Sequence, residues 1–184
     1  EPKWIEKILL TLEDSFDISN VKEITLEANP GEAPLDRLIE YYKLGINRLS
    51  LGFQSLQPDL LTFLSRIHSP EDCLIIYKNA RNAGFGNINI DMLFNIPDQS
   101  IEKWKTDLKQ IVEMEPNHIS AYSLTVENNT NLYKQIQTKQ IIMPSEKIDL
   151  SMFEYCQEYL LLNNYKQYEI SNYAKRHMKC YHNL

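Results

Sequence analysis

Apolar residues along this chain switch between a spacing near 3.6, typical of helices, and a spacing near two, typical of strands. Helices are predicted at residues 4–15, 35–44, 58–64, 69–83, 100–114 and 145–162, and extended segments at 23–27, 48–54, 87–94, 118–124 and 168–171. Because strands and helices alternate with short connections, we expect parallel strands joined by right-handed crossovers. The pattern predicts an α/β protein, either a doubly wound sheet or part of a barrel.

Capping residues define several of these helix ends. Ser69 precedes Pro70, which is the arrangement of an N-cap followed by proline in the first turn. Ser100 is the expected N-cap of the following helix. Gly45 and Gly84 come directly after two predicted helices, where glycine commonly ends a helix. The middle of the chain therefore has well-defined boundaries between elements.

Alternation inside the strands separates an apolar face from a polar face. In the second strand Leu49 and Phe53 share one face, whereas Ser50 and Gln54 share the other, and three further strands repeat this division. Strands covered by helices on both faces are apolar on both. A polar face therefore favours a curled sheet, part of a TIM-like barrel of parallel strands, with helices outside and a polar ligand inside.

Polar residues at the ends of successive strands are the candidate site. Glu27, Gln54 and Asp91 fall at strand ends, and active sites of barrels lie at the carboxyl ends of strands. We therefore expect the three to line a shared ligand pocket. The alternatives are that they fill a layered core, that Glu27 caps a turn, and that Asp91 is the buried partner of Arg48 or Arg66.

Composition limits the class of protein. The chain has 184 residues, an apolar fraction of 43%, a charged fraction of 24% and a net charge of −6. These values suit one globular domain and argue against nucleic acid as a partner. No apolar run is long enough to span a bilayer. The chain begins without Met inside a helical pattern, and we interpret it as a piece of a longer protein.

The cysteines are few and far apart in the sequence. Cys73, Cys156 and Cys180 form neither a disulfide framework nor a closely spaced metal motif, which favours a cytoplasmic location. Near the end of the chain Cys180 and His182 offer a thiolate and an imidazole two residues apart. Such a pair could ligate a metal or haem iron, and a tail without a role is the alternative.

Several blocks of sequence together resemble one known family. They are residues 27–31 (Glu-Ala-Asn-Pro-Gly), 45–55, 66–69, 87–97, 116–122 and 168–174. These blocks resemble the radical S-adenosylmethionine proteins related to oxygen-independent coproporphyrinogen III oxidase, and most of all the HemW-like haem chaperones. The resemblance covers nearly the whole chain. It implies a partial radical S-adenosylmethionine barrel over residues 1–164 and the start of a C-terminal extension over 165–184.

The resemblance also implies cofactors. In this family a [4Fe–4S] cluster held by Cys-x3-Cys-x2-Cys reductively cleaves S-adenosylmethionine to a radical. Glu27 matches a residue that holds the ribose hydroxyls of this cofactor, and Gln54, Arg66 and Asp91 match further contact positions. Thr125 occupies another such position with a different residue. The cluster cysteines lie upstream of this chain in the family, so we expect these residues alone to bind no cluster and to be inactive.

Two functions remain open under this resemblance. The first is a HemW-like haem chaperone, with Cys180 and His182 as haem contacts. The second is an oxidoreductase, coproporphyrinogen dehydrogenase, which converts two propionates to vinyl groups. The expected partners are porphyrin or haem and, for the longer protein, an electron donor, with membrane contact only through a haem acceptor. A barrel that binds another small polar molecule is a third alternative.

Overall fold

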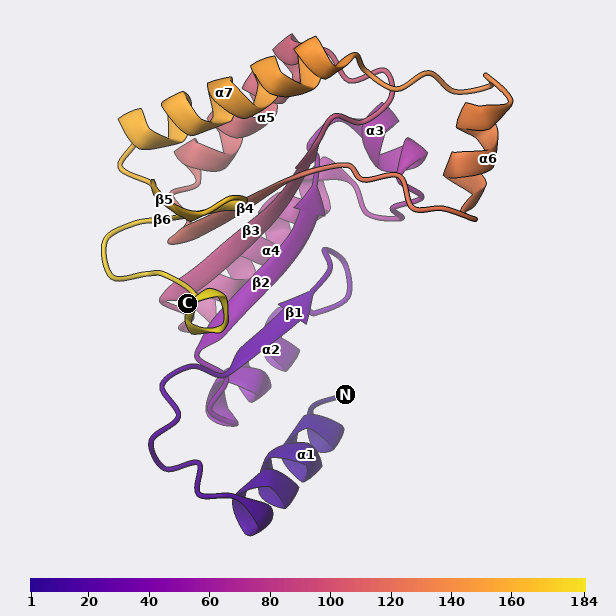
Figure 1. Ribbon diagram of the computed structural model, residues 1–184. Coiled ribbons are helices and arrows are strands. Elements are labelled where there is room, and N and C mark those ends of the chain that lie inside the picture. Colours follow the sequence, from indigo (N-terminus) through magenta and orange to yellow (C-terminus); the bar gives the residue numbers. More distant parts are fainter.

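The computed structural model describes all residues 1–184 and consists of one mixed six-stranded sheet with helices (Figure 1). Its strands are β1 (Thr25–Ala28), β2 (Arg48–Gln54), β3 (Asn87–Phe94), β4 (His118–Ser123), β5 (Lys166–Glu169) and β6 (Asn172–Ala174). The spatial order is β1-β2-β3-β4-β6-β5. Strands β1 to β4 are parallel, as predicted, whereas β6 runs antiparallel to both β4 and β5.

Eight helical segments connect or follow the strands. They are α1 (Pro2–Ser15), α2 (Leu35–Lys43), α3 (Pro58–Phe63), α4 (Pro70–Asn82), α5 (Ile101–Glu113), α6 (Asn131–Gln137), α7 (Glu146–Leu162) and the short 3-10 helix η1 (Tyr181–Asn183). All six predicted helices are present, and α6 and η1 were not predicted. None of the helices combines the length and the apolarity needed to cross a membrane.

The predicted helix ends are confirmed where a cap was expected. Ser69 and Asp72 form a capping box, with the Ser69 hydroxyl accepting from the Asp72 N–H and the Asp72 carboxylate accepting from the Ser69 N–H. The Ser100 hydroxyl accepts from the Lys103 N–H at the start of α5. Gly45 has φ +92°, the left-handed conformation that ends α2. Sequence signals of this kind act locally, and the structure follows them.

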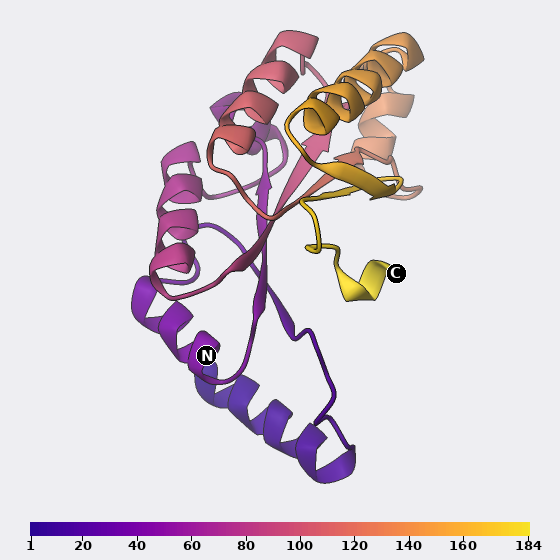
Figure 2. The ribbon, with the colours of Figure 1, turned by 90° about the vertical axis from the view of Figure 1, so that its left-hand side faces the viewer.

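The helices cover one face of the sheet, and the C-terminal tail folds back across the other (Figure 2). Leu49, Phe53 and Ile90 point toward the helices and are fully buried. The Trp104 indole N–H donates to the Met152 carbonyl at 3.0 Å and joins α5 to α7. The apolar face predicted from the alternation is therefore the core of the protein, and the opposite face is free for polar residues.

The end of the chain differs from the expected single extended segment. Residues Lys166–Ala174 form the hairpin β5–β6, and β6 adds to the edge of β4. The sheet is not closed: β1 is one edge strand and β5 is the other. The predicted fold class, a partial barrel of mainly parallel strands with outer helices, is confirmed. The boundary predicted near residue 165 stays a prediction.

Candidate functional site

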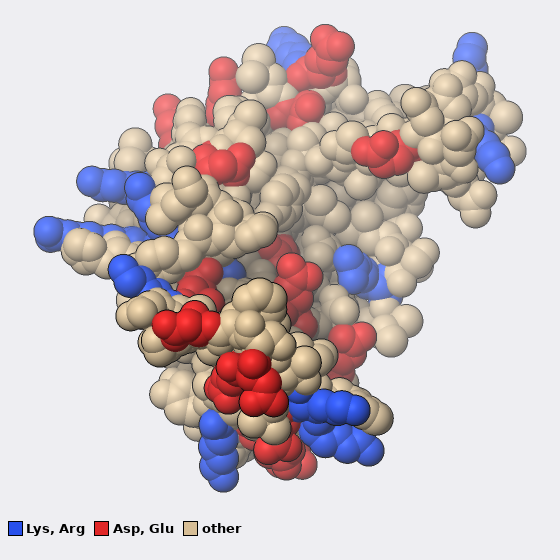
Figure 3. Space-filling model, turned by 60° about the horizontal axis from the view of Figure 1, so that its bottom comes forward, with Lys and Arg blue, Asp and Glu red and all other residues tan.

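A polar cavity of about 520 Å³ lies on the face of the sheet opposite the helices. Each parallel strand contributes two of its lining residues: Thr25 and Glu27, Arg48 and Ser50, Asn89 and Asp91, Ser120 and Tyr122. Alternate side chains of a strand share a face, so the parallel register collects these pairs on one surface. Figure 3 shows acidic side chains in the middle of the face that is turned toward the viewer, with Lys and Arg mainly around its edges.

Asp91 is held by hydrogen bonds to neutral side chains. The Ser50 hydroxyl donates to one carboxylate oxygen at 2.8 Å, and the Asn89 amide donates to the other at 2.7 Å. The interpretation of Asp91 as the buried ion-pair partner of Arg48 or Arg66 is therefore wrong. Each carboxylate oxygen has further lone pairs, so Asp91 can accept hydrogen bonds from a ligand in the cavity.

Glu27 lines the same cavity and has no hydrogen bond or ion pair within the protein. It lies beside Ser50 in the register of β1 and β2. A nearby side chain takes the turn-capping role that was considered for Glu27: the Glu32 carboxylate accepts from the Asn29 amide at 3.0 Å. Glu27 is therefore a free carboxylate at the cavity, able to accept two hydrogen bonds from vicinal hydroxyls.

A chain of hydrogen bonds runs from Asp91 through the buried part of the site. Asn89 donates to Asp91, so its amide oxygen faces His118 and accepts from Nδ1 of that ring at 2.6 Å. His118 Nε2 is then the acceptor, and the Tyr168 hydroxyl donates to it at 2.7 Å. The Tyr168 oxygen in turn accepts from the Cys180 N–H at 3.1 Å. The chain thus has a single direction from the tail to the cavity.

The protonation state of His118 is consistent with hydrogen bonds that are donated in the direction from Tyr168 to Asp91. The ring is fully buried, and burial, aided by the charge of Arg48, lowers the pKa of His118 to about 3. The ring is neutral near pH 7 with its proton on Nδ1. Ser120 extends the network: its single hydroxyl proton lies within hydrogen-bond distance of the amide oxygens of Asn89 (3.1 Å) and Asn172 (2.9 Å). Buried polar groups on β3, β4 and β6 therefore satisfy one another.

Gln54 and Arg66 lie in a neighbouring cluster at the carboxyl end of β2. The Arg66 guanidinium donates to the Asn29 amide oxygen at 3.2 Å. A Cβ on Gly52 would come within 2.9 Å of that oxygen and 3.2 Å of the Gln54 amide nitrogen, so a larger residue here would displace these side chains. The structure brings these side chains together beside Gly52, the residue paired with Asp91, but not among the residues that line the cavity.

The remaining predicted contacts lie in two places. Thr125 is exposed in the loop after β4 and does not line the polar cavity. His182 and Cys180 both line the cavity; His182 is exposed, whereas Cys180 is buried and its thiol donates to Glu23 at 3.3 Å. Burial raises the pKa of the Cys180 thiol. The tail therefore has a defined position at the cavity.

The cysteines do not form a metal site within this chain. Cys73 lies on α4, Cys156 on α7 and Cys180 in the tail, and no group of three potential ligands could hold a metal ion. Burial raises the pKa of Cys73 and of Cys156 to about 12, so both are thiols near neutral pH. The residues present here do not fit an iron–sulfur cluster.

Sequence reasoning did not identify several residues of the site. The sequence pattern predicts only extended segments at His118, Tyr168 and Glu23, and offers Arg48 only as an alternative partner for Asp91. The alternation of apolar and polar residues within β3 and β4 does indicate part of the site, because Asn89 and Ser120 share the polar face with Asp91 and Tyr122. Nothing local to Tyr168 or Glu23 indicates that the tail reaches them across the sheet.

Curled parallel strands, helices on the outer face and a polar cavity on the inner face define a partial barrel of the (β/α) type. The family model described as the Radical SAM superfamily matches residues 2–111. The chain belongs to the radical SAM superfamily.

Within that superfamily the relatives carry one recurrent name. The chain is 39% identical over 162 residues to "Heme chaperone HemW" of Escherichia coli (strain K12), which covers 88% of this chain and 42% of the relative. It is 36% identical over 180 residues to the Buchnera aphidicola (strain Sg) protein of that name, covering 98% and 46%. It is 33% identical to "Radical S-adenosyl methionine domain-containing protein 1, mitochondrial" of Danio rerio over 184 residues, covering 100% and 41%. The chain spans less than half the length of these relatives.

The fold has a solved counterpart. The structure described as "Coproporphyrinogen III oxidase (HemN) from Escherichia coli is a Radical SAM enzyme." superimposes with a TM-score of 0.83, covering 96% of this chain and 41% of that one. At 23% sequence identity this likeness shows the fold alone. The predicted family is confirmed, with HemW-like proteins as the sequence relatives.

Proposed function

We propose that this chain is the cofactor-holding part of a HemW-like haem chaperone. Curated relatives at 33–39% identity support the proposal, because two of the three described above are named heme chaperones. The likeness to the oxidase is one of fold alone. Because the named relatives are heme chaperones, the proposed partner is haem or porphyrin. A cytoplasmic location, an electron donor and a membrane-bound haem acceptor belong to the same proposal.

The observation that carries the cofactor part of the proposal is the pair of carboxylates at one cavity. Glu27 is free to accept hydrogen bonds from the ribose hydroxyls of S-adenosylmethionine, and Asp91 is held in place by Ser50 and Asn89. A cavity of about 520 Å³ is within the usual range for such ligands. When bound beside a cluster supplied by the rest of the protein, S-adenosylmethionine supplies a reductively cleavable sulfonium bond.

Binding of S-adenosylmethionine to the full-length protein tests this assignment by calorimetry. Glu27→Gln keeps the shape of the side chain but removes the charge that strengthens its hydrogen bonds to hydroxyls. We expect the Kd to rise roughly 10- to 100-fold, the equivalent of losing about 1.5–3 kcal/mol of charged hydrogen bonding. Glu40→Gln, on the exposed side of α2, is the matched control and should leave the Kd unchanged.

An unchanged Kd for Glu27→Gln would contradict the cofactor assignment and favour a barrel that binds another polar molecule. The oxidase alternative is separated by product analysis. A chaperone binds haem and forms no protoporphyrinogen from coproporphyrinogen III, whereas turnover by the full-length protein would establish the oxidase.

A further inference from the structure

Arg48 is a buried cation at one end of the cavity. It begins β2, its side chain is 5% exposed, and it lines the cavity together with Ser50. In the strand register Arg48 pairs with Thr25. This pair lies two residues nearer the amino ends of the strands than the pair of Glu27 and Ser50. At about 3.3 Å per residue, its Cα lies roughly 13 Å along β2 from Gly52, the level of Asp91.

The guanidinium of Arg48 is largely unsatisfied. It has five N–H donors, yet its one hydrogen bond is a contact at the limiting distance, from Nη1 to the Thr25 hydroxyl at 3.5 Å. The buried Nε has no hydrogen-bond partner. Glu23 Oε2 lies 3.9 Å from Nε, which is an ion-pair distance but too long for a hydrogen bond. A buried charge with so few partners is costly unless a ligand supplies them.

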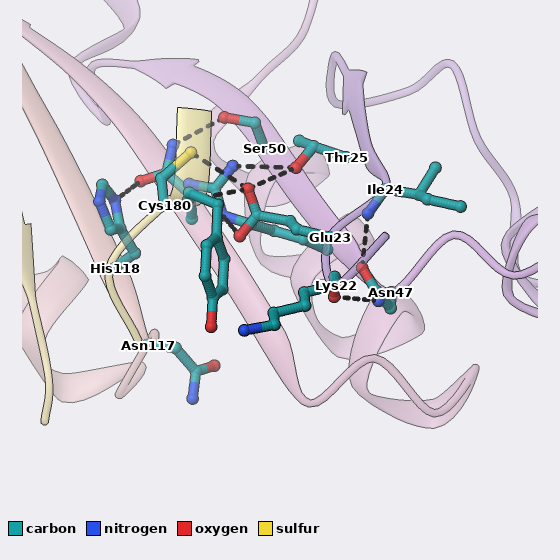
Figure 4. A network of polar contacts seen from close by, with 12 residues as sticks. Lys22, Glu23, Ile24, Thr25, Asn47, Ser50, Asn117, His118 and Cys180 are labelled. Carbon is teal, nitrogen blue, oxygen red and sulfur yellow. Dashed lines mark hydrogen bonds and ion pairs between the residues drawn. The ribbon is translucent and has the colours of Figure 1, made fainter. Parts of the chain in front are cut away.

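Glu23 is shared between Arg48 and the tail: its Oε2 faces the guanidinium at the long distance of 3.9 Å, and the tail holds its other oxygen. Its Oε1 accepts from the Cys180 thiol at 3.3 Å and from the Tyr181 N–H at 3.2 Å. Figure 4 shows Glu23, Thr25 and Cys180 close together at this end of the site. The tail residue His182 lines the cavity at the same end. The unsatisfied cation therefore lies next to the residues predicted to contact haem.

We propose that Arg48 is a carboxylate-binding residue that receives a propionate of the porphyrin, an inference that rests on the proposed haem-binding function. A planar, singly charged carboxylate can accept two parallel N–H bonds from a guanidinium. A phosphate dianion suits this place less, because Glu23 lies beside Arg48, and Glu27 and Asp91 line the same cavity. One cation among three carboxylates selects a ligand with a single negative group at this end.

Haem binding to the full-length protein, followed by its Soret absorbance, tests the proposal. Arg48→Gln should raise the Kd for haem roughly 10- to 100-fold, from the loss of one charged, two-pronged interaction. Arg48→Lys keeps the positive charge beside Glu23 but not the fork, and should bind haem with intermediate affinity. Arg176→Gln, in the exposed loop after β6, is the matched control and should behave as wild type.

The dimethyl ester of haem identifies the group that Arg48 recognises. Wild-type protein should bind the ester as weakly as Arg48→Gln binds haem, and Arg48→Gln should lose nothing further with the ester. Equal haem affinity of wild type and both Arg48 variants would overturn the inference and leave the chaperone proposal standing. If wild-type protein bound no haem, the proposed function itself would fail, and the inference with it.

S-adenosylmethionine also has a carboxylate, so its affinity is measured in the same variants. We expect less than a two-fold change for Arg48→Gln, because Arg48 lies away from the level of Asp91. A loss of S-adenosylmethionine binding with unchanged haem binding would assign Arg48 to the methionine carboxylate and overturn the porphyrin assignment.

Discussion

The two faces of the same parallel strands are stabilised in different ways. On the outer face the side chains of Leu49, Phe53 and Ile90 are fully buried against helices and make no polar contacts. On the inner face Asn89 and Ser120 are also buried, but each is held by directed hydrogen bonds. The stability of the outer face depends on the volume that its side chains fill, since apolar burial is non-directional. The stability of the inner face depends on which atoms donate hydrogen bonds and which atoms accept them.

This difference separates folding from binding. Apolar side chains of similar size can replace one another on the outer face at small cost. On the inner face a substitution of the same size removes a donor or an acceptor and leaves its partner unsatisfied. The cavity lies at the point where the inner network stops: Asp91 is held by neighbours, whereas Glu27 and Arg48 point toward the cavity with few partners.

The largest expected effect is on the outer face. Phe53→Ala should lower the free energy of unfolding by about 3–5 kcal/mol, because it leaves a cavity beneath the helices. Phe53→Leu largely retains apolar contact and should cost much less, about 1.5 kcal/mol. Urea denaturation of both variants gives these values. If both variants lost the same stability, volume would not be what the outer face depends on.

A change at the centre of the inner face should cost somewhat less stability. Asn89 makes four hydrogen bonds, to Ser50, Asp91, His118 and Ser120. Asn89→Ala leaves several buried groups without partners, and we expect a loss of about 3 kcal/mol in the free energy of unfolding. It should also weaken S-adenosylmethionine binding, because Asp91 loses a donor.

Asn87→Ala is the matched control for Asn89→Ala. Asn87 begins the same strand, and its amide makes no hydrogen bond within the protein. Its replacement should change the free energy of unfolding by less than about 0.5 kcal/mol. Equal losses for the two variants would show that the hydrogen-bond network of the inner face contributes nothing beyond an ordinary strand position.

The outer face and the helix ends are the parts of the fold that sequence predicts well. Capping at Ser69 and the glycine after α2 act within a few residues, so local chemistry decides them. The pattern predicts one extended segment where the structure has the hairpin β5–β6, because β6 has only three residues and depends on pairing with β4. Helix α6, with seven residues and none of them buried, has little apolar periodicity to detect.

The sequence predicts those parts of the candidate site whose position depends on strand register alone. Glu27 and Asp91 reach one cavity because parallel strands align their alternate residues. Gln54 does not line it, because the register shifts between Gly52 and Gln54, and Gln54 takes φ +67°. Arg48 could be placed on the polar face from the pattern. Its shortage of hydrogen bonds depends on how the side chains of Glu23 and Thr25 lie beside it in space, which no local pattern reveals.

The smallest of these effects is a dependence of stability on pH. The folded protein keeps His118 neutral, with its pKa lowered to about 3 by burial, whereas in the unfolded chain the ring titrates near its usual 6.5. Below pH 6.5 the unfolded chain therefore binds a proton that the folded protein does not, and stability is lost as the pH falls toward 3.

We expect His118 alone to lower the free energy of unfolding by about 2 kcal/mol between pH 6.5 and pH 4.5. Subtracting the pH profile of His118→Gln from that of wild type isolates this contribution. If the wild-type and His118→Gln profiles were parallel over this range, His118 would take up a proton in the folded protein at the same pH as in the unfolded chain, and burial in this network would not keep the ring neutral.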